Sequence, residues 1–476
     1  MTFTSGLFYL ALPLLALIYY FLPLKQQKLL LLAASLGFYW YNQPRYVLLL
    51  VLCGGVSYLA AWGIWHWRGR KAGTAVLTAG CLFHFGMLFV LKYLNAFVGL
   101  LGAEQPVHSL VMPLGISFFT FAITGYLFDV YRGKMERRKS LLDHMLFVCF
   151  FPCLLAGPVG KAREFFPQLE QRHSFRLQRV KWGALRFLYG LVQKLVLADT
   201  LAIPVNAMYN GELSRGSWAV VAMLYVLQLY FDFAGYSNMA IGTAGILGFE
   251  IPENFKQPYL SVSVREFWKK WHISLTGWFR EYLYFPLGGS KKGTLRRYFN
   301  ILVVFAVSGL WHGAAGTYVL WGLVNGLLQV AELMLEPLEQ KIRKAAGGLP
   351  RALKRCGELL RGVITYLLIS GAWILFRAES VRQAVHVLKG ALGNFLYFRL
   401  TLENLGLSAV QLWMVGILLL AAISVDAVRA AGKRVQRLAD TTVAYYAVVV
   451  VLILCAAVFG VYGQGFDPQS FVYFKY

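Results

Sequence analysis

The chain has 476 residues, of which 58% are hydrophobic, 16% are aromatic and only 14% are charged, and its mean hydropathy is +0.57. A water-soluble domain of this length cannot bury so much apolar surface, so the composition predicts a protein that crosses a membrane several times. The net charge of +24 does not indicate nucleic-acid binding, because lysines and arginines form no continuous basic face and cluster between apolar runs.

Apolar runs recur along nearly the whole chain, and many are long enough to cross the ~30 Å of a bilayer's hydrocarbon core. We expect full or partial spans at residues 8–24, 29–40, 47–67, 75–101, 145–158, 182–203, 219–233, 300–310 continuing into 318–334, 363–376, 410–425 and 444–462. Several runs are too short to span alone and are predicted to be tilted, buried or re-entrant. No internal repeat or soluble domain interrupts them, so we expect one all-α polytopic membrane domain over residues 1–476.

Basic clusters separate these runs, and the positive-inside rule places them in the cytoplasm, next to an anionic leaflet. The clusters are residues 25–28, 68–71, 132–139, 161–181, 291–297, 341–361 and 429–437. Because Lys25 and Lys28 follow the first run and residues 1–7 carry no charged side chain, the N terminus is expected outside, and the last cluster puts the C terminus outside as well. The first run lacks a basic n-region and a cleavage site, which predicts a retained span.

The six cysteines lie mostly in apolar segments, and the spacing of Cys149 and Cys153 is not a usual metal or redox spacing, so we predict no metal site or disulfide. Six of the eight histidines lie in loops or alone on apolar faces and are expected to be structural: His66, His84, His108, His144, His173 and His386.

The first polar interruption of the hydropathy pattern covers residues 112–121 and 126–133. Pro113 and Gly115 predict a broken helix, whose freed backbone groups must face protein or water. Asp129 stands three residues before Arg132, which favours an ion pair at the cytoplasmic interface over a catalytic role for the carboxylate.

The second interruption, residues 228–238, contains Asp232 inside an apolar run. An unpaired carboxylate in a span is costly, so we expect a partner, most plausibly an arginine or a hydroxyl from a neighbouring helix. Small residues at 234, 235 and 237 would let that helix approach closely. A structural role for Asp232 and a place in the wall of an active site remain open alternatives.

The third interruption, residues 265–290, is too charged to span and predicts an amphipathic or re-entrant segment at the cytoplasmic interface. Its cations, with Trp271 beside them, suit a phosphorylated acyl donor, and the alternative is an interfacial anchor without a ligand. The candidate donor-binding cations are Lys269, Lys270 and Arg280.

The fourth interruption, residues 308–315, contains the second of two Trp-His pairs, Trp271-His272 and Trp311-His312, which lie forty residues apart. Burial disfavours the imidazolium form, so a histidine here should be neutral and able to accept a proton from a hydroxyl. Such a residue can act as a general base for acyl transfer to an alcohol. The alternative is a packing histidine bonded to a backbone carbonyl.

In their order along the chain, these blocks resemble the membrane-bound O-acyltransferase family, within it the branch of the membrane subunit of bacterial alginate O-acetylation. The resemblance runs from the first apolar run to residues 471–474 and is densest over residues 112–133, 228–255 and 265–326. It implies that His312, in Trp-His-Gly, is the principal catalytic residue. It also implies a second functional histidine at His272, in the pattern Phe-Trp-basic-basic-Trp-His-Ile-Ser.

The sequence departs from the family pattern at two positions. Asn238 stands where related sequences often have aspartate, and Asn325 stands where histidine is common. Neither departure touches the histidine pair, and both leave the acceptor or an accessory partner open.

The resemblance implies a ring of tilted transmembrane helices, with re-entrant or interfacial segments, around a central funnel or tunnel in the bacterial inner membrane. It implies transfer of an acetyl group from cytosolic acetyl-CoA, with no bound cofactor, for O-acetylation of a secreted polysaccharide. A separate extracytoplasmic transferase of the SGNH-hydrolase type is the expected partner. Asp232, Trp271 and Trp311 are expected to help form the site.

Two other functions remain as alternatives. One is D-alanyl transfer from a carrier protein to teichoic acid, although residues 284–290 resemble the alginate branch. The other is a polysaccharide or lipid transporter without catalysis, which should show repeated halves. For the acyltransferase we expect His312 at membrane depth and His272 nearer the cytoplasmic mouth. Both should open onto one passage that Asp232 and residues 112–121 help to wall.

Overall fold

In the computed structural model of the chain, the described residues are 1–102, 106–107, 111–135, 139–212, 218–345, 347, 350–393, 405–430, 442–461 and 471. Their regular structure is helical, and no strand occurs among them, which confirms the predicted all-α class. The expectations for His108, for most of the basic cluster 429–437 and for residues 472–474 fall outside the described residues.

The first half of the chain forms helices that begin and end close to the predicted apolar runs. In chain order they are α1 (Gly6–Phe21), α2 (Leu24–Asn42), η1 (Pro44–Tyr46), α3 (Val47–His66), α4 (Lys71–Leu88), η2 (Phe89–Tyr93), α5 (Leu94–Leu100), α6 (Ile116–Tyr131), α7 (Leu141–Cys149), α8 (Phe151–Leu154), α9 (Ala162–Phe165), η3 (Phe166–Leu169), α10 (Leu177–Val192), η4 (Gln193–Ala198), α11 (Asp199–Tyr209) and α12 (Trp218–Ile246).

The second half begins with short helices and continues with long ones. These are η6 (Pro258–Leu260), α13 (Val264–Lys270), α14 (Ile273–Phe279), η7 (Arg280–Tyr284), α15 (Thr294–His312), α16 (Gly316–Ala345), α17 (Arg351–Arg377), α18 (Val381–Gly393), α19 (Ala409–Ala430) and α20 (Thr442–Phe459).

Eight helical stretches of the described chain are long and apolar enough to cross a membrane, as the composition predicted. They are Pro44–His66, Lys71–Gly99, Leu177–Tyr209, Trp218–Ile246, Gly316–Ile342, Arg351–Arg377, Ala409–Val428 and Thr442–Phe459. Two shorter apolar helices are α1 and α6. The chain is therefore a polytopic membrane protein.

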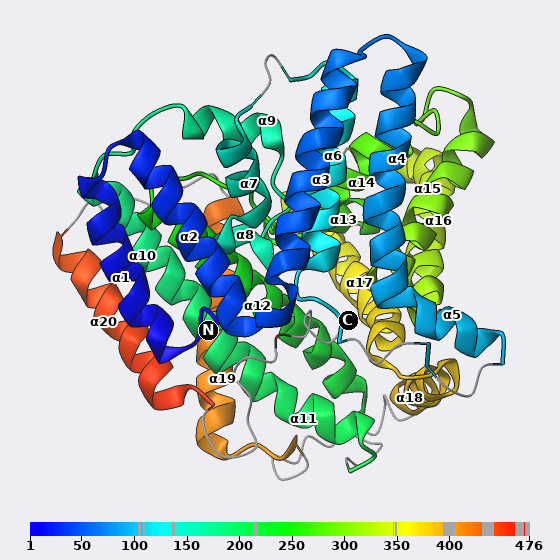
Figure 1. Ribbon diagram of the computed structural model, residues 1–476. Helices are drawn as coiled ribbons and strands as arrows, with labels where there is room; N and C mark the ends of the chain where they lie inside the picture. The colour runs from blue at the N-terminus through cyan, green and yellow to red at the C-terminus, as the bar shows by residue number, and fades with distance from the viewer. Residues whose placement is uncertain are drawn as a thin grey trace.

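Helix α12 runs through the centre of the molecule and packs against α10, η4, α11, α17 and α18 (Figure 1). The backbones of α10 and α12 nearly touch, because a Cβ atom added to Gly190 would lie 2.5 Å from the carbonyl oxygen of Gly235. The small residues at 234, 235 and 237 were predicted to allow a neighbouring helix to pack closely. Gly235 does so, and the neighbouring helix is α10.

The connection from α12 to α15 contains only short helices, and its central part is buried in the protein. Trp271 and His272 are 1% and 2% exposed. An irregular backbone is tolerated inside a membrane protein when protein groups satisfy its hydrogen bonds. This burial counts against an amphipathic helix lying on the surface, and the re-entrant placement stays a prediction.

The basic connections gather on one side of the helices. The loop between α3 and α4, the α9 region and the start of α15 lie near the top of Figure 1, whereas α11 and α18 lie near the bottom. The marked N terminus lies below the middle, toward the side opposite the loop that follows α3. Which of these sides faces the cytoplasm stays a prediction of the positive-inside rule.

Candidate active site

His312 is the last residue of α15, at the closed end of a tight helical hairpin with α16. A Cβ atom added to Gly309 would lie 2.2 Å from the carbonyl oxygen of Tyr318, and one added to Gly322 would lie 2.1 Å from that of Phe305. Only glycine allows this approach, so the hairpin packing fixes where α15 ends and where His312 lies.

Aromatic rings surround the His312 imidazole. Its centroid lies 4.8 Å from that of Trp311, 5.2 Å from that of Trp321 and 5.0 Å from that of Phe376, which comes from α17. The side chain is buried, at 4% exposure. These apolar walls disfavour a charged imidazolium, as the sequence predicted.

His272 lies between α13 and α14 in an unusual backbone conformation. Its φ of +43° falls in the left-handed region, where only one other non-glycine residue of the described chain, Gln257, is found. Side chains with a Cβ atom adopt this conformation at a cost, which persists only where the surroundings enforce it. Burial lowers the pKa of His272 to about 3, so its ring is neutral at physiological pH.

Asn254 enforces the turn at His272. Its carbonyl oxygen accepts from the Ile273 amide at 2.9 Å, and its Oδ1 accepts from the Ser274 hydroxyl at 2.6 Å. Its Nδ2 donates to the Ser237 hydroxyl on α12 at 3.0 Å. One buried amide thus joins the residues that follow His272 to the central helix.

Both histidines line one small cavity of about 40 Å³. Its walls are Trp268, Trp271, His272, Leu275, Thr276, Phe279, Val304, Phe305, Ser308 and His312. The volume admits two or three water molecules or a small group, since one water needs roughly 10–15 Å³ by this measure. The shared cavity confirms part of the predicted geometry, and a continuous passage to both membrane faces stays a prediction.

Residues 112–121 contribute to the site as expected. α6 begins at Ile116, after a left-handed Gly115, so the predicted break is present. The Phe118 ring lies 6.5 Å from that of His272 and 5.4 Å from that of Trp311, measured between centroids. The Trp311 and His272 rings are 6.2 Å apart, so Trp311 belongs to the aromatic wall.

Lys92 is a residue of the site that the sequence reasoning missed. Its Nζ donates to the carbonyl oxygen of Trp311 at 2.7 Å and to the Ser117 hydroxyl at 3.3 Å, from the π-helical turn η2. The Tyr93 hydroxyl donates to the Leu310 carbonyl at 2.9 Å. Both groups satisfy carbonyls at the negative end of α15. A lysine inside the apolar run 75–101 was the available signal.

Trp268 is a second missed residue. It lines the histidine cavity, and its buried indole Nε1 has no hydrogen-bond partner among the residues that the structure describes. A buried N–H group without a partner is uncommon, and it can donate to a ligand oxygen in the cavity. Its position in the Phe-Trp-basic-basic-Trp-His pattern could have identified it.

Asp232 is buried, but it does not line the cavity. Its Oδ1 lies 2.7 Å from the Nζ of Lys194, which also contacts Asp199 at 2.7 Å. The expected partner is present, and its described cation is a lysine of η4 where an arginine was predicted. Asp232 approaches the site only through its neighbour Phe233, whose ring lies 4.7 Å from that of His272.

The predicted donor-binding cations are not in the cavity wall. Lys269 and Arg280 are exposed, and Arg280 stacks on Phe285 at 6.0 Å. Lys270 pairs with Glu266 at 2.6 Å. Only Trp271 of this predicted group reaches the cavity.

The two departures from the family pattern also lie outside the cavity wall. The Oδ1 of Asn238 accepts from the Arg186 guanidinium at 3.1 Å, and the Nδ2 of Asn325 donates to the Trp321 carbonyl at 2.8 Å. In the described part of the chain, no three His, Cys, Asp or Glu side chains are grouped to hold a metal ion.

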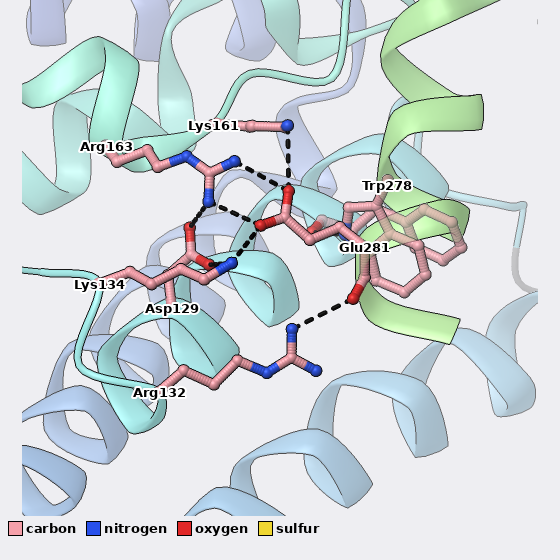
Figure 2. A network of polar contacts seen from close by, with 8 residues as sticks. Asp129, Arg132, Lys134, Lys161, Arg163, Trp278 and Glu281 are labelled. Carbon is pink, nitrogen blue, oxygen red and sulfur yellow. Dashed lines mark hydrogen bonds and ion pairs between the residues drawn. The ribbon is translucent and has the colours of Figure 1, made fainter. Parts of the chain in front are cut away.

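A network of charged groups holds the segment after α14 (Figure 2). Glu281 accepts two hydrogen bonds from Arg163, at 2.7 and 2.8 Å, and contacts Lys161 at 3.1 Å and Lys134 more closely. The Arg163 hydrogen bonds hold the pKa of Glu281 well below its usual range. The segment is thereby clamped to α9 and to the residues that follow α6.

Asp129 belongs to the same network, but its predicted pairing was wrong. Its carboxylate contacts Arg163 at 3.5 Å and Lys134 at 3.9 Å. Arg132 instead donates to the backbone oxygen of Glu281 at 3.1 Å (Figure 2). The structural role expected for Asp129 agrees with this network, which neither histidine joins.

Comparisons with known proteins identify the class. Residues 110–345 match the model of MBOAT, the membrane-bound O-acyltransferase family, and this stretch contains both histidines and every residue of their cavity. The chain belongs to this family and is a membrane-bound acyltransferase. The transporter alternative without catalysis is therefore set aside.

Individual relatives narrow the class. The chain is 36% identical over 417 residues to a probable alginate O-acetylase AlgI of Pseudomonas putida, covering 83% of this chain and 81% of the relative. It is 33% identical over 399 residues to a peptidoglycan O-acetyltransferase of Helicobacter pylori, covering 77% of this chain and 74% of the relative. It is 25% identical over 323 residues to a teichoic acid D-alanyltransferase of Bacillus subtilis, covering 65% of this chain and 80% of the relative.

Proposed function

We propose that this protein passes an acetyl group from cytosolic acetyl-CoA across the bacterial inner membrane for O-acetylation of an exported polysaccharide. The observation that carries the proposal is the cavity shared by His272 and His312, two residues of different elements. Relatives named as O-acetylases of alginate and peptidoglycan support acetyl as the acyl group and a carbohydrate polymer as the final acceptor.

In the proposed reaction, His312 accepts the proton of an acceptor hydroxyl while the hydroxyl oxygen attacks the thioester carbonyl. The new C–O bond forms, the C–S bond breaks, and the proton passes from His312 to the leaving thiolate. The free Nε1–H of Trp268 can donate to the carbonyl oxygen as negative charge develops on it. The neutral ring of His272 supplies a second polar group beside the reacting atoms.

The proposal includes a wider arrangement around this chemistry. A ring of tilted helices would surround a funnel that donor and acceptor enter from opposite faces. The hydroxyl would come from the outer side, presented by a separate extracytoplasmic transferase of the SGNH-hydrolase type, which then acetylates the polymer. Support comes from the eight candidate spans and from cavity walls contributed by α13, α14 and α15.

The test is acetylation of the exported polymer by cells that carry the His312→Ala variant. We expect acetylation to be abolished while protein level and membrane insertion stay close to wild type. The matched control is His386→Ala on α18, where an exposed histidine contacts Trp218 and should be dispensable. Near-normal acetylation by His312→Ala would refute the proposed function.

The relative from Bacillus subtilis supports one alternative, transfer of D-alanine from a carrier protein. The donor separates the two functions, because acetyl-CoA is a free thioester and a carrier protein presents its thioester on a folded domain. Membranes that incorporate label from acetyl-CoA without a carrier protein support the first function. Incorporation that requires a charged carrier protein supports the second.

A further inference from the structure

An apolar groove runs along the side of the molecule between α4 and α15. We call it the aromatic groove. Its volume is about 550 Å³, within the range of small-molecule sites, and its walls come from α4, η2, α5, α6, α14, η7 and α15. No described side chain in these walls is charged, and most are aromatic or aliphatic. Figure 1 shows α4 and α15 beside each other, with α5 below them.

The aromatic groove opens toward the lipid. Phe89 and Phe97 line it within the candidate span Lys71–Gly99, and they are 40% and 49% exposed. Leu310 lines it on α15 and is 46% exposed. Exposed apolar side chains on a helix that crosses the membrane lie against hydrocarbon. The occupant that these walls favour is therefore an apolar chain supplied by the bilayer.

One end of the groove carries a cation. Phe128 and Tyr282 line the groove at this end, and the Arg132 guanidinium stacks on both rings, 5.6 and 5.5 Å from their centroids. Arg132 is exposed and donates to the carbonyl oxygen of Glu281 at 3.1 Å (Figure 2). The stacking and this hydrogen bond hold the guanidinium in place. A fixed guanidinium favours charge-assisted hydrogen bonds to a phosphate.

Neighbouring cations are neutralised, whereas Arg132 is not. Lys161 and Arg163 contact the Glu281 carboxylate at 3.1 and 2.7 Å. No carboxylate of the described residues forms an ion pair with Arg132. Arg132 belongs to the basic cluster 132–139, which the positive-inside rule assigns to the cytoplasmic side, where the leaflet is anionic. The charge at this end of the groove therefore complements an anionic head group.

The groove adjoins the histidine site. Phe279 lines both the groove and the histidine cavity. Trp311, which directly precedes His312, is 5% exposed and also lines the groove. So does Tyr93, whose hydroxyl donates to the Leu310 carbonyl near the end of α15. An occupant of the groove therefore packs against residues that hold His312 in place.

We infer that the aromatic groove binds one anionic phospholipid of the cytoplasmic leaflet, with an acyl chain in the groove and the phosphate on Arg132. An acyl chain is surrounded by apolar groups in the bilayer as well, so its packing alone gives little selectivity. Arg132 supplies the preference for an anionic head group. The lipid is not a substrate. It completes the packing beside Phe279 and Trp311 and thereby supports acetyl transfer, an effect that rests on the proposed function.

Two variants and a matched control separate the head group from the acyl chain. Arg132→Gln removes the cation, and Ala96→Phe fills the groove from α5 with an aromatic ring. Arg296→Gln is the control. Arg296 is also exposed, stacks on Phe299 at 5.3 Å and donates to the Leu287 carbonyl at 3.4 Å, but it does not line the groove.

The experiment titrates the delipidated full chain with phosphatidylglycerol, which is anionic, or with phosphatidylcholine, which is zwitterionic. Mass spectrometry of the intact complex gives the Kd of the first bound lipid. For Arg132→Gln we expect the Kd of phosphatidylglycerol to rise about tenfold, as the loss of a charged hydrogen bond predicts, and that of phosphatidylcholine to stay unchanged. Ala96→Phe should raise both Kd values. Arg296→Gln should bind both lipids like the wild type.

The charge and the fold are separated by Arg132→Lys, which keeps the cation and should recover part of the affinity for phosphatidylglycerol. Equal affinity of the wild type for the two lipids would overturn the proposal, and so would wild-type affinity of Arg132→Gln for phosphatidylglycerol. A groove that instead receives a transmembrane helix of another protein would show no lipid preference, and Ala96→Phe would then leave both Kd values unchanged.

Activity provides a second measurement. Acetyl transfer by the wild type should rise several-fold when phosphatidylglycerol is added to nanodiscs of phosphatidylcholine, and Arg132→Gln should respond less. If the wild type showed no lipid preference and His312→Ala still abolished acetylation, the lipid site would be overturned and the proposed function would stand. If phosphatidylglycerol bound as expected and His312→Ala acetylated normally, the proposed function would fail and the lipid site would stand.

Discussion

The two histidines of the cavity are positioned in different ways. His312 ends a regular helix, and its place depends on how closely α15 and α16 pack at Gly309 and Gly322. His272 lies in a left-handed turn between two short helices, and its place depends on hydrogen bonds to Asn254. One position is set by backbone packing between neighbours in the chain, and the other by a polar side chain eighteen residues away.

This difference predicts different sensitivities. Helix packing distributes its energy over many contacts, so single polar substitutions should move His312 little. A turn that few hydrogen bonds enforce should lose its geometry when one of them is removed. Substitutions around His272 should therefore reduce activity without a proportionate loss of stability, and the following experiments test that contrast.

Among substitutions other than those of His312, the largest effect should come from removing the His272 imidazole. We expect His272→Ala to lower the rate of polymer acetylation by about 100-fold, the lower range for general acid–base groups. His272→Gly should be equally inactive but more stable than His272→Ala by roughly 1 kcal/mol, because glycine adopts a positive φ without strain. Thermal unfolding of the two variants checks the second part, and an alanine variant at least as stable as the glycine variant would contradict it.

Next in size should be the loss of the Asn254 side chain. Asn254→Ala removes the acceptor for Ser274 and the donor to Ser237, and we expect acetylation to fall about tenfold or more. The control is Asn300→Ala, since Asn300 is also buried and donates to the carbonyls of Leu287 and Gly289, away from the cavity. The unfolding temperature of each variant is measured beside its activity. If Asn254→Ala and Asn300→Ala lost the same activity for the same fall in unfolding temperature, Asn254 would not have a positioning role.

A smaller loss should follow removal of the Lys92 charge. Lys92→Met leaves the Trp311 carbonyl without its Lys92 donor, so the end of α15 should loosen. Acetylation should then fall several-fold, which corresponds to roughly 1 kcal/mol of activation free energy. Lys92→Arg should recover part of the activity. Tyr93→Phe removes a neighbouring bond to Leu310 and serves as the comparison. If Lys92→Met were as active as the wild type, the hydrogen bond from Lys92 would not matter for activity and its role would be packing alone.

The smallest effect on activity should come from Glu281, whose network lies apart from both histidines. Its pKa is depressed in the folded protein by hydrogen bonds from Arg163, so its contribution to stability is present above the unfolded value of about 4.3 and is lost as pH falls below it. Glu281→Gln should lower the unfolding temperature by at least about 2 °C at pH 7. The difference in unfolding temperature between Glu281→Gln and the wild type should become smaller below about pH 4. A difference that did not change with pH would contradict a stabilising role for the ionised Glu281 carboxylate.

The features that the sequence made predictable are those with a local pattern. Apolar runs of spanning length became the helices of the candidate spans, and Gly115 marked the break before α6. The Trp-His-Gly motif singled out His312, whose side chain lines the cavity that it shares with His272, and its catalytic role stays a prediction. These inferences need only residues that are near one another in the chain.

The features that were missed or misassigned depend on contacts between distant residues. No local pattern pairs Asp232 with Lys194, or joins Lys92 to the end of α15 across more than two hundred residues. Asp129 and Arg132 have helical spacing, yet Arg163 and Lys134 provide the nearer charges. Charged residues at membrane depth signal that a partner exists, and only the packing of helices decides which one it is.

If acyl transfer takes place in the histidine cavity as proposed, the size of the cavity limits which acyl groups fit there. A volume of about 40 Å³ walled by Leu275, Phe279, Val304 and Phe305 leaves little room beyond a two-carbon group. Each additional methylene must push these side chains from their packed positions, at roughly 1–3 kcal/mol, which corresponds to a preference of roughly 5- to 150-fold for the shorter chain. The packed wall would thus limit the length of the acyl group. It would exclude long acyl chains, whose thioesters are present in the same cytosol.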